Sequence, residues 1–150
     1  MDLVDRRLVD ALRKDGRASY AELGRAVGLS SSAVHERVGK LESAGVILGY
    51  RADVAPGSVG IGVTAMIGIE PGENGRDEII GAALDAIPEV ESCYAVAGDE
   101  AFLLWVRVAS VDDLHQLLGT LRAIDGVART RTTVVLATRF ESRYRTIADS

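Results

Sequence analysis

The sequence has a single cysteine, few aromatic residues and no long apolar run. Cys93 alone can form neither an internal disulfide nor a zinc site, which predicts a reducing compartment. No apolar run approaches the roughly 18 residues that a membrane span requires. Asp2 and Asp5 stand where a secretory signal would be basic and then apolar. These absences predict a cytoplasmic protein without a signal peptide or a membrane span.

An excess of positive charge is missing too, because 17 Lys and Arg face 22 Asp and Glu and the net charge is −5. The sign is unevenly spread, however. Residues 1–53 hold nine basic and eight acidic side chains, whereas residues 54–150 hold eight and fourteen. A DNA-binding region needs a local basic face rather than a basic total. The net charge therefore does not exclude DNA binding by the first part.

The sequence also lacks the residue groupings of an enzyme. Its two histidines, His35 and His115, fall in different parts of the chain. No Ser/His/Asp set, no metal-ligand spacing and no glycine-rich loop after a strand is present. We therefore predict no catalytic residue, no metal and no cofactor.

What the sequence does contain is a helical stretch over residues 30–45. Val34, Val38 and Leu41 recur at i, i+4 and i+7 and form one narrow apolar stripe. Such a helix could enter a DNA groove with its other face, or that face could be an ordinary solvated surface. The other face has no large apolar residue and carries Ser32, His35, Glu36, Gly39, Lys40 and Ser43.

Two further helices are predicted before this stretch. Residues 3–15 have apolar side chains at helical spacing, and Ser19 with Glu22 spells the capping box of a second helix that ends at Gly28. Only Gly28, Leu29 and Ser30 then connect the two helices. Two helices joined by such a glycine-containing turn form a helix-turn-helix, whose second helix lies in the major groove of DNA.

The chain changes character after Gly45. Residues 46–54 are rich in β-branched side chains without helical periodicity, which predicts a short strand or wing. A turn-rich border follows, with a proline, a serine and two glycines between positions 56 and 60. We therefore divide the chain into a helix-turn-helix domain (residues 1–53), a linker (54–62) and a second domain (63–150).

The second domain alternates between the two periodicities in the order βαββαβ. This order is typical of a ferredoxin-like α+β domain, in which two helices cover one face of an antiparallel sheet. Residues 90–108 are apolar on both sides, so we expect a second copy of the chain to bury the other face. The predicted strands are residues 63–69, 90–97, 101–108 and 127–137, and the predicted helices are 77–87 and 111–124.

Segments in both parts of the chain share one further pattern, in which the informative residues are Asp5, Leu12, Gly16, Arg17, Leu29, Ser30, Ser32, Val34, Arg37, Val38, Leu41, Gly45, Val46, Ile47, Gly49, Tyr50, residues 96–104, residues 127–130, Thr132, Val135 and Leu136. With these residues, a winged helix-turn-helix followed by a βαββαβ domain resembles the Lrp/AsnC (feast/famine) family of transcription regulators. The resemblance implies homodimers built through the second domain, commonly assembled into tetramers or octamers, and an amino-acid effector near Gly98, Asp99 and Glu100. It also implies a protein that works at the nucleoid.

The predicted effector residues match the groups that an amino acid needs. An ammonium requires acceptors, which Asp99 and Glu100 offer, and a carboxylate requires donors, such as the turn N–H of Gly98. The family often has an aromatic residue where Glu100 and Ala101 stand here. The added carboxylate favours a basic effector if it points inward, or it is a solvated turn residue. Thr130 and Thr132 share one face of the last strand, either for binding or for β-propensity.

The predicted DNA-binding residues supply phosphate and base contacts. Cations hold the phosphates, and hydroxyl and imidazole groups near the helix start read base edges. Glu36 either accepts from a cytosine amino group or pairs with Lys40 one turn later. Each cation has the alternative of being a surface residue, as Arg25 has. The predicted set is Arg17, Ser31, Ser32, His35, Glu36, Arg37, Lys40 and Arg51.

Two other functions stay open at this point. Sirohaem decarboxylases resemble the same two-domain architecture and use histidines near the second-domain pocket, where His115 is the one candidate. The same family also includes architectural proteins that coat DNA with weak specificity. The sequence does not separate such a protein from a local regulator.

Overall fold

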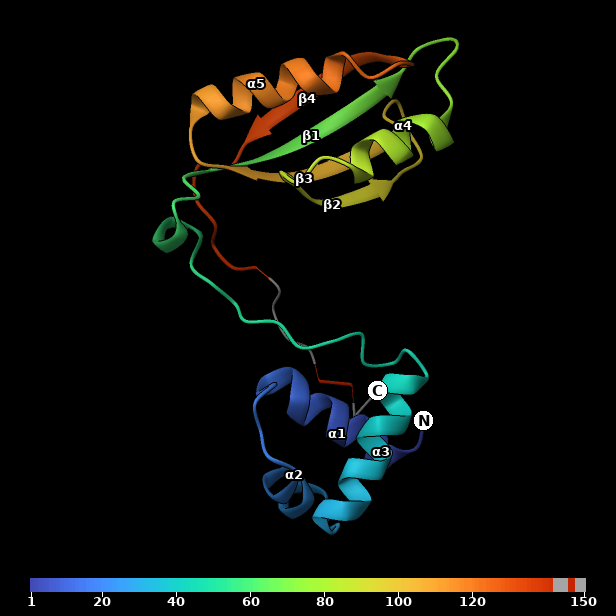
Figure 1. Ribbon diagram of the computed structural model, residues 1–150, viewed down its shortest axis with the longest axis vertical. Helices are drawn as coiled ribbons and strands as arrows, with labels where there is room; N and C mark the ends of the chain where they lie inside the picture. Colours follow the sequence, from blue (N-terminus) through green and yellow to red (C-terminus); the bar gives the residue numbers. More distant parts are fainter. Residues whose placement is uncertain (142–145, 148–150) are drawn as a thin grey trace. The chain divides into compact units, whose positions relative to one another are not determined.

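The computed structural model describes residues 1–141 and 146–147. The chain divides into two compact units (Figure 1). The first unit comprises Met1–Asp53 with the described residues of the C-terminal segment from Phe140, and the second unit comprises Val54–Arg139. None of the described helices has the length and apolar character needed to cross a membrane.

Three helices make up the first unit: α1 (Leu3–Lys14), α2 (Tyr20–Val27) and α3 (Ser31–Ser43). Both α1 and α2 begin with a reciprocal capping box, formed by Asp2 with Asp5 and by Ser19 with Glu22. Each box satisfies two main-chain N–H groups that the first turn would otherwise leave unpaired. The capping box predicted at Ser19 is therefore confirmed.

The turn between α2 and α3 depends on two glycines. Gly28 ends α2 in the left-handed conformation, with φ of 75°. The N–H of Leu29 then bonds back to the carbonyl of Gly24 at 2.9 Å. A Cβ on Gly24 would lie 2.4 Å from the carbonyl oxygen of Leu29, which is far inside van der Waals contact. The angle between α2 and α3 thus requires the absence of a side chain at Gly24.

One small core holds these helices together. Leu8 of α1, Leu23 of α2, and Val34 and Val38 of α3 are almost completely buried against one another. The apolar stripe predicted for α3 is therefore confirmed, and the rest of that helix is left to face outward.

The strand or wing predicted over residues 46–54 is not present. Gly45 ends α3, with the N–H of Val46 bonded to the carbonyl of Leu41 at 2.9 Å, and the chain then runs without regular structure to the 3₁₀ helix η1 (Pro56–Val59). β-Branched residues form a strand only where a neighbouring strand pairs with them, and no described residue does so here. Tyr50 instead donates to Glu42 at 2.9 Å; burial, and then this bond, raises the pKa of Tyr50 to about 12.

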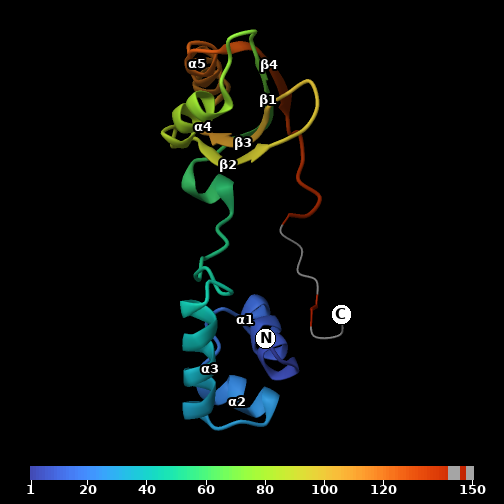
Figure 2. The ribbon, with the colours of Figure 1, turned by 90° about the vertical axis from the view of Figure 1, so that its right-hand side faces the viewer.

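The second unit is a four-stranded antiparallel sheet with two helices. Its strands β1 (Val63–Pro71), β2 (Val90–Ala95), β3 (Phe102–Val108) and β4 (Val127–Val134) lie in the order β2-β3-β1-β4. The helices α4 (Asp77–Asp85) and α5 (Val111–Arg122) cover one side of the sheet (Figure 2). The predicted βαββαβ order and the α+β fold class are confirmed.

The two faces of this sheet differ. Alternate residues of β1 and β3, among them Ile67 and Leu104, are buried with the helices in the core. The residues between them lie on what we call the open face, the side of the sheet opposite α4 and α5. Its large apolar side chains include Met66, Tyr94 and Leu103, which are 45%, 60% and 41% exposed.

Candidate nucleic-acid interface and effector site

The outward face of α3 presents most of the residues that the sequence assigned to DNA. Burial of Val34 and Val38 fixes the rotation of the helix, so the side chains opposite them face solvent. Ser30 caps the helix by accepting from the N–H of Ala33 at 3.2 Å, and its hydroxyl lies 3.1 Å from that of Ser32. The exposed residues of the predicted set on this helix are Ser31, Ser32, His35, Glu36 and Lys40.

The pair predicted within α3 is present. Lys40 Nζ donates to Glu36 Oε1 at 2.7 Å, and both side chains are mostly exposed. The hydrogen bond from Lys40 and the charge of the same group lower the pKa of Glu36. The carboxylate therefore stays ionised and partly neutralises a cation at the centre of the face that would meet DNA.

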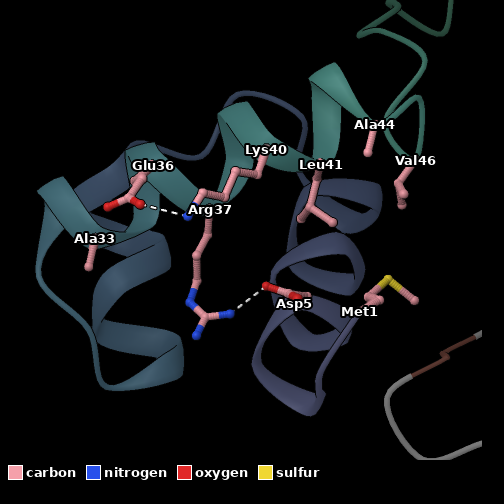
Figure 3. A pocket seen from close by; sticks show the side chains of 9 residues that line it. All are labelled: Met1, Asp5, Ala33, Glu36, Arg37, Lys40, Leu41, Ala44 and Val46. Carbon is pink, nitrogen blue, oxygen red and sulfur yellow. Dashed lines mark hydrogen bonds and ion pairs between the residues drawn. The ribbon is translucent and has the colours of Figure 1, made fainter.

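Arg37, which the sequence assigned to DNA, is engaged by two carboxylates of the first unit. Its Nη1 lies 2.8 Å from Asp2 Oδ2 and 2.7 Å from Asp5 Oδ1, so the side chain crosses from α3 to the start of α1 (Figure 3). These bonds raise the pKa of Arg37; that of Asp2 is lowered chiefly by the N–H of Asp5 and next by Arg37. The guanidinium links two helices, and we remove it from the set proposed to contact DNA.

An aromatic contact supports the other edge of α3. The rings of His35 and Tyr20 meet edge to face, with their centroids 5.1 Å apart. Tyr20 is the first residue of α2 and was not singled out from the sequence. The sequence signal was its position directly after the Ser19 cap, at the start of α2. The contact fixes the direction of His35 while the imidazole stays exposed.

A pocket of about 460 Å³ lies between α3 and the start of α1 (Figure 3). Two carboxylates and two cations line it, but they already pair with each other as Lys40 with Glu36 and Arg37 with Asp5. The pocket therefore offers a charged ligand no unbalanced group. Its lining residues are Met1, Asp5, Ala33, Glu36, Arg37, Lys40, Leu41, Ala44 and Val46.

The remaining predicted cations lie outside α3. Arg17 is exposed after α1, where its main-chain N–H bonds to Asp15, and Arg51 is exposed beyond the end of α3. Arg25 lies exposed in the last turn of α2. Their side chains have the reach and the charge for phosphate contacts at the margins of the helix-turn-helix.

In the second unit, residues 96–101 form the loop between β2 and β3. The N–H of Ala101 bonds to the carbonyl of Ile69 at 2.8 Å, and that of Val96 bonds to the carbonyl of Ala101 at 3.0 Å, so the base of the loop is fixed. Gly98 and Asp99 are exposed at its tip. Their groups are accessible to a small polar ligand.

Glu100 of this loop lies on the open face. A Cβ on Gly68 would lie 2.7 Å from Glu100 Cγ, so the side chain rests on the bare backbone of β1. Its Oε1 is 3.3 Å from Arg131 Nη1. The carboxylate is therefore already paired, which weakens the argument from sequence that it selects a basic effector.

Sequence reasoning missed the rest of this charged cluster. Glu70 Oε2 lies 3.6 Å from Arg129 Nε, and Glu70 Oε1 lies 3.7 Å from Arg131 Nη2. Two carboxylates and two guanidinium groups thus share one end of the open face. Alternation along β4 was the available signal, because Arg129 and Arg131 flank Thr130 and must share the opposite face.

Thr130 and Thr132 do not join Glu100. Thr130 Oγ1 accepts from Arg122 Nε of α5 at 3.1 Å, and Thr132 is paired in register with the buried Ile67. Both threonines therefore lie on the helix-covered side, whereas Glu100 lies on the open face. The structure splits the predicted effector set between the two sides of the sheet.

The described residues contain no metal site, since no group of three or more His, Cys, Asp or Glu in them could hold an ion. His115 lies exposed on α5. Cys93 is a free cysteine, and partial burial followed by the charge of Asp85 raises its pKa. The thiol is held protonated at neutral pH and is a poor nucleophile.

Comparison with known proteins gives a consistent result for both units. A family model described as an AsnC-type helix-turn-helix domain matches residues 1–42, and one described as an Lrp/AsnC ligand binding domain matches residues 63–144. The chain is 46% identical, over 143 residues, to the HTH-type transcriptional regulator LrpA of Mycobacterium tuberculosis, and the match covers 95% of each chain.

Solved structures agree with these matches. A feast or famine regulatory protein of M. tuberculosis complexed with L-methionine superposes with a TM-score of 0.91 and 44% identity, over 97% of this chain and 99% of that one. A Neisseria meningitidis transcriptional regulator in complex with L-methionine superposes with a TM-score of 0.86 and 30% identity, over 94% and 93%.

Proposed function

Because the chain belongs to the Lrp/AsnC family of transcriptional regulators, we propose that it binds double-stranded DNA through α3 and responds to an amino acid bound by the second unit. The prediction of a regulator rather than an enzyme is confirmed by its relatives, which are named as transcriptional regulators. Such a protein acts at the nucleoid, in the cytoplasm.

The outward face of α3 is the observation that carries the DNA proposal. A short capped helix is held by its apolar stripe so that only small and polar side chains face outward. This geometry admits the helix to a major groove, which is about 12 Å wide. In this proposal Ser31, Ser32 and His35 meet base edges near the helix start, while Arg17, Lys40 and Arg51 meet phosphates.

Glu36 holds Lys40 until DNA competes for the ammonium. A phosphate can replace the carboxylate as the partner of Lys40, which then leaves Glu36 free to accept from a cytosine amino group. The two alternatives that the sequence left for Glu36 are in this view two states of one pair. The pairing itself costs little to break, because both groups are exposed.

The DNA proposal is tested by fluorescence anisotropy with the DNA upstream of the protein's own gene. We expect Lys40→Ala to weaken binding to all sequences alike and His35→Ala to relax the preference at one base position by about 1–3 kcal/mol. Arg76→Ala, which removes an exposed cation of the second unit, is the control and should bind normally. Wild-type affinity and preference in both α3 variants would refute the assignment.

For the effector, we propose an amino acid with an uncharged side chain, bound at the loop of residues 96–101. Two relatives were solved with L-methionine, and Glu100 here is already occupied by a guanidinium. Asp99 is exposed and can accept from the ammonium, and the main-chain N–H of the preceding Gly98 can donate to the carboxylate. Arg131 is added as a donor to the effector carboxylate, and Thr130 and Thr132 are set aside.

Calorimetry with L-methionine, L-leucine and L-arginine tests this choice. We expect binding of one of the two uncharged side chains, weakened at least about tenfold by Arg131→Gln, which removes a charged hydrogen-bond donor. Arg129→Gln is the matched control, because Arg129 pairs with Glu70 and not with Glu100. Binding of arginine alone would reject the proposed class, and binding of none would reject the site.

We also propose that a second copy of the chain covers the open face and that such dimers assemble further. The support is the row of exposed apolar side chains beside a charged cluster of zero net charge, a surface that suits a protein rather than DNA. Trp105 lies on this face and is the single tryptophan. Its emission should therefore shift to the red when the copies separate on dilution.

A further inference from the structure

The proposed function makes no use of Asp10, a charged side chain that the fold buries. Asp10 belongs to α1 and is 7% exposed. Both of its carboxylate oxygens lie 3.0 Å from the main-chain nitrogen of Ile147, a residue 137 positions later in the chain. Arg13 Nη1 lies 4.0 Å from Asp10 Oδ1. A carboxylate is buried at low cost only where donors meet it, and here one donor comes from the end of the chain.

We infer that this side of α1 is a docking site for the C-terminal segment, with the Asp10 carboxylate as receptor and the N–H of Ile147 as ligand. The donor is a main-chain group, so the contact does not depend on the side chain at position 147. Any residue except proline, which has no N–H, can form it. The acceptor is charged, which makes the bond stronger than one between neutral groups.

Docking gives the two units a second connection. Residues 54–62 already join the first unit to β1, and Ile147, which follows β4 in the chain, is bonded to α1 of the first unit. A unit held by two chain segments explores fewer orientations than a unit held by one. The C-terminal segment thereby transmits a change in the second unit directly to the helix that Arg37 links to α3.

Hydrogen exchange of the full-length protein tests the docking without DNA or effector. We expect the amide at position 147 to exchange roughly tenfold or more slowly than an unprotected amide, because its hydrogen is bonded to a partly buried acceptor. Ile147→Ala keeps the N–H and should keep this protection. Asp10→Asn removes the charge and one acceptor oxygen and should lose most of it. An unprotected amide in the wild-type protein would overturn the inference.

A second arm tests the transmission, which rests on the proposed function. Ile147→Pro removes the N–H donor, and Ile147→Ala is its control. We expect the proline variant to bind a single DNA half-site as the wild type does, but to lose most of the effect of L-methionine on binding to a paired site. An unchanged effect would overturn the transmission. If the wild type binds neither DNA nor L-methionine, the proposed function fails, while the exchange result still decides the docking.

Discussion

The two units of this chain bury very different amounts of apolar surface. Among the described residues, four form the buried cluster of the first unit, whereas twelve form that of the second. The first unit compensates with local devices, namely two capping boxes, a glycine turn and the ion pairs of Arg37. Its stability therefore depends on a few exact contacts, while that of the second unit is spread over a sheet and two helices.

Their outward faces differ as well. The first unit turns a polar helix face outward, on which Lys40 pairs with Glu36 of the same helix. The second unit turns outward an apolar sheet face, on which the carboxylates Glu70 and Glu100 are paired with arginines. The outward face of α3 suits reversible contacts with DNA phosphates, whereas the open face of the sheet suits lasting contact with another protein. Each of the following changes should affect one unit and spare the other.

The largest effect is expected on the open face. Leu103→Glu places a carboxylate at the centre of the proposed contact between copies, where each uncompensated charge costs several kcal/mol. We expect the dimer dissociation constant to rise by roughly 10³-fold or more, measured by light scattering over a dilution series. Val111→Glu changes an exposed residue of α5 on the other side of the sheet and should leave assembly intact. An intact dimer in Leu103→Glu would show that the open face is not the interface.

The next effect falls on the turn of the first unit. Gly24→Ala drives a methyl group into the carbonyl of Leu29, which costs about 3 kcal/mol, while better helix propensity returns about 1. We expect a net loss of roughly 2 kcal/mol, measured as thermal unfolding of the first unit. Gly39→Ala is the matched control, since nothing lies within 4 Å of its added Cβ, and it should be neutral or stabilising. Equal behaviour of both variants would contradict the close approach.

A smaller effect should separate the two cations of α3. Lys40→Gln is expected to weaken DNA binding about tenfold and to reduce the salt dependence by about one phosphate contact, without changing the unfolding temperature. Arg37→Gln should instead lower the unfolding temperature and leave DNA affinity and its salt dependence unchanged, because the guanidinium bonds to Asp2 and Asp5. Salt titrations and thermal melts of both variants make the comparison. A loss of affinity in Arg37→Gln with an unchanged melt would return Arg37 to the DNA-contacting set.

Local signals in the sequence predicted most of this fold. The cap at Ser19, the glycine at position 28 and the stripe of Val34 each act within a few residues, so the pattern alone determines their outcome. The strand predicted over residues 46–54 failed because a strand needs a partner, and propensity does not show whether one is present.

The candidate site was predicted less completely, because it depends on contacts between distant residues. The direction of Arg37 is set by two carboxylates over thirty positions away, and that of Glu100 by a bare glycine of another strand. Thr130 and Thr132 share one face of the last strand as predicted, but the sequence did not show that this is the face toward the helices, because that follows from register rather than from residue type. Asp10 gave no signal, because its partner lies near the other end of the chain.

The smallest effect is expected at low pH and again belongs to the first unit. The N–H of Asp5, and then Arg37, lower the pKa of Asp2 below its ordinary value of 3.8. A group with a lowered folded-state pKa stabilises the fold above its unfolded-state pKa, and this contribution is lost as the pH falls through the lowered value. In thermal melts, Asp2→Asn should therefore be less stable than the wild type at pH 7, and the difference should shrink as the pH falls below 3.8. Asp112→Asn, which removes one charge from the start of α5, controls for net charge. A difference between Asp2→Asn and the wild type that is constant from pH 7 to pH 3 would show that the asparagine perturbs the cap itself, and that the charge of Asp2 adds nothing to the fold.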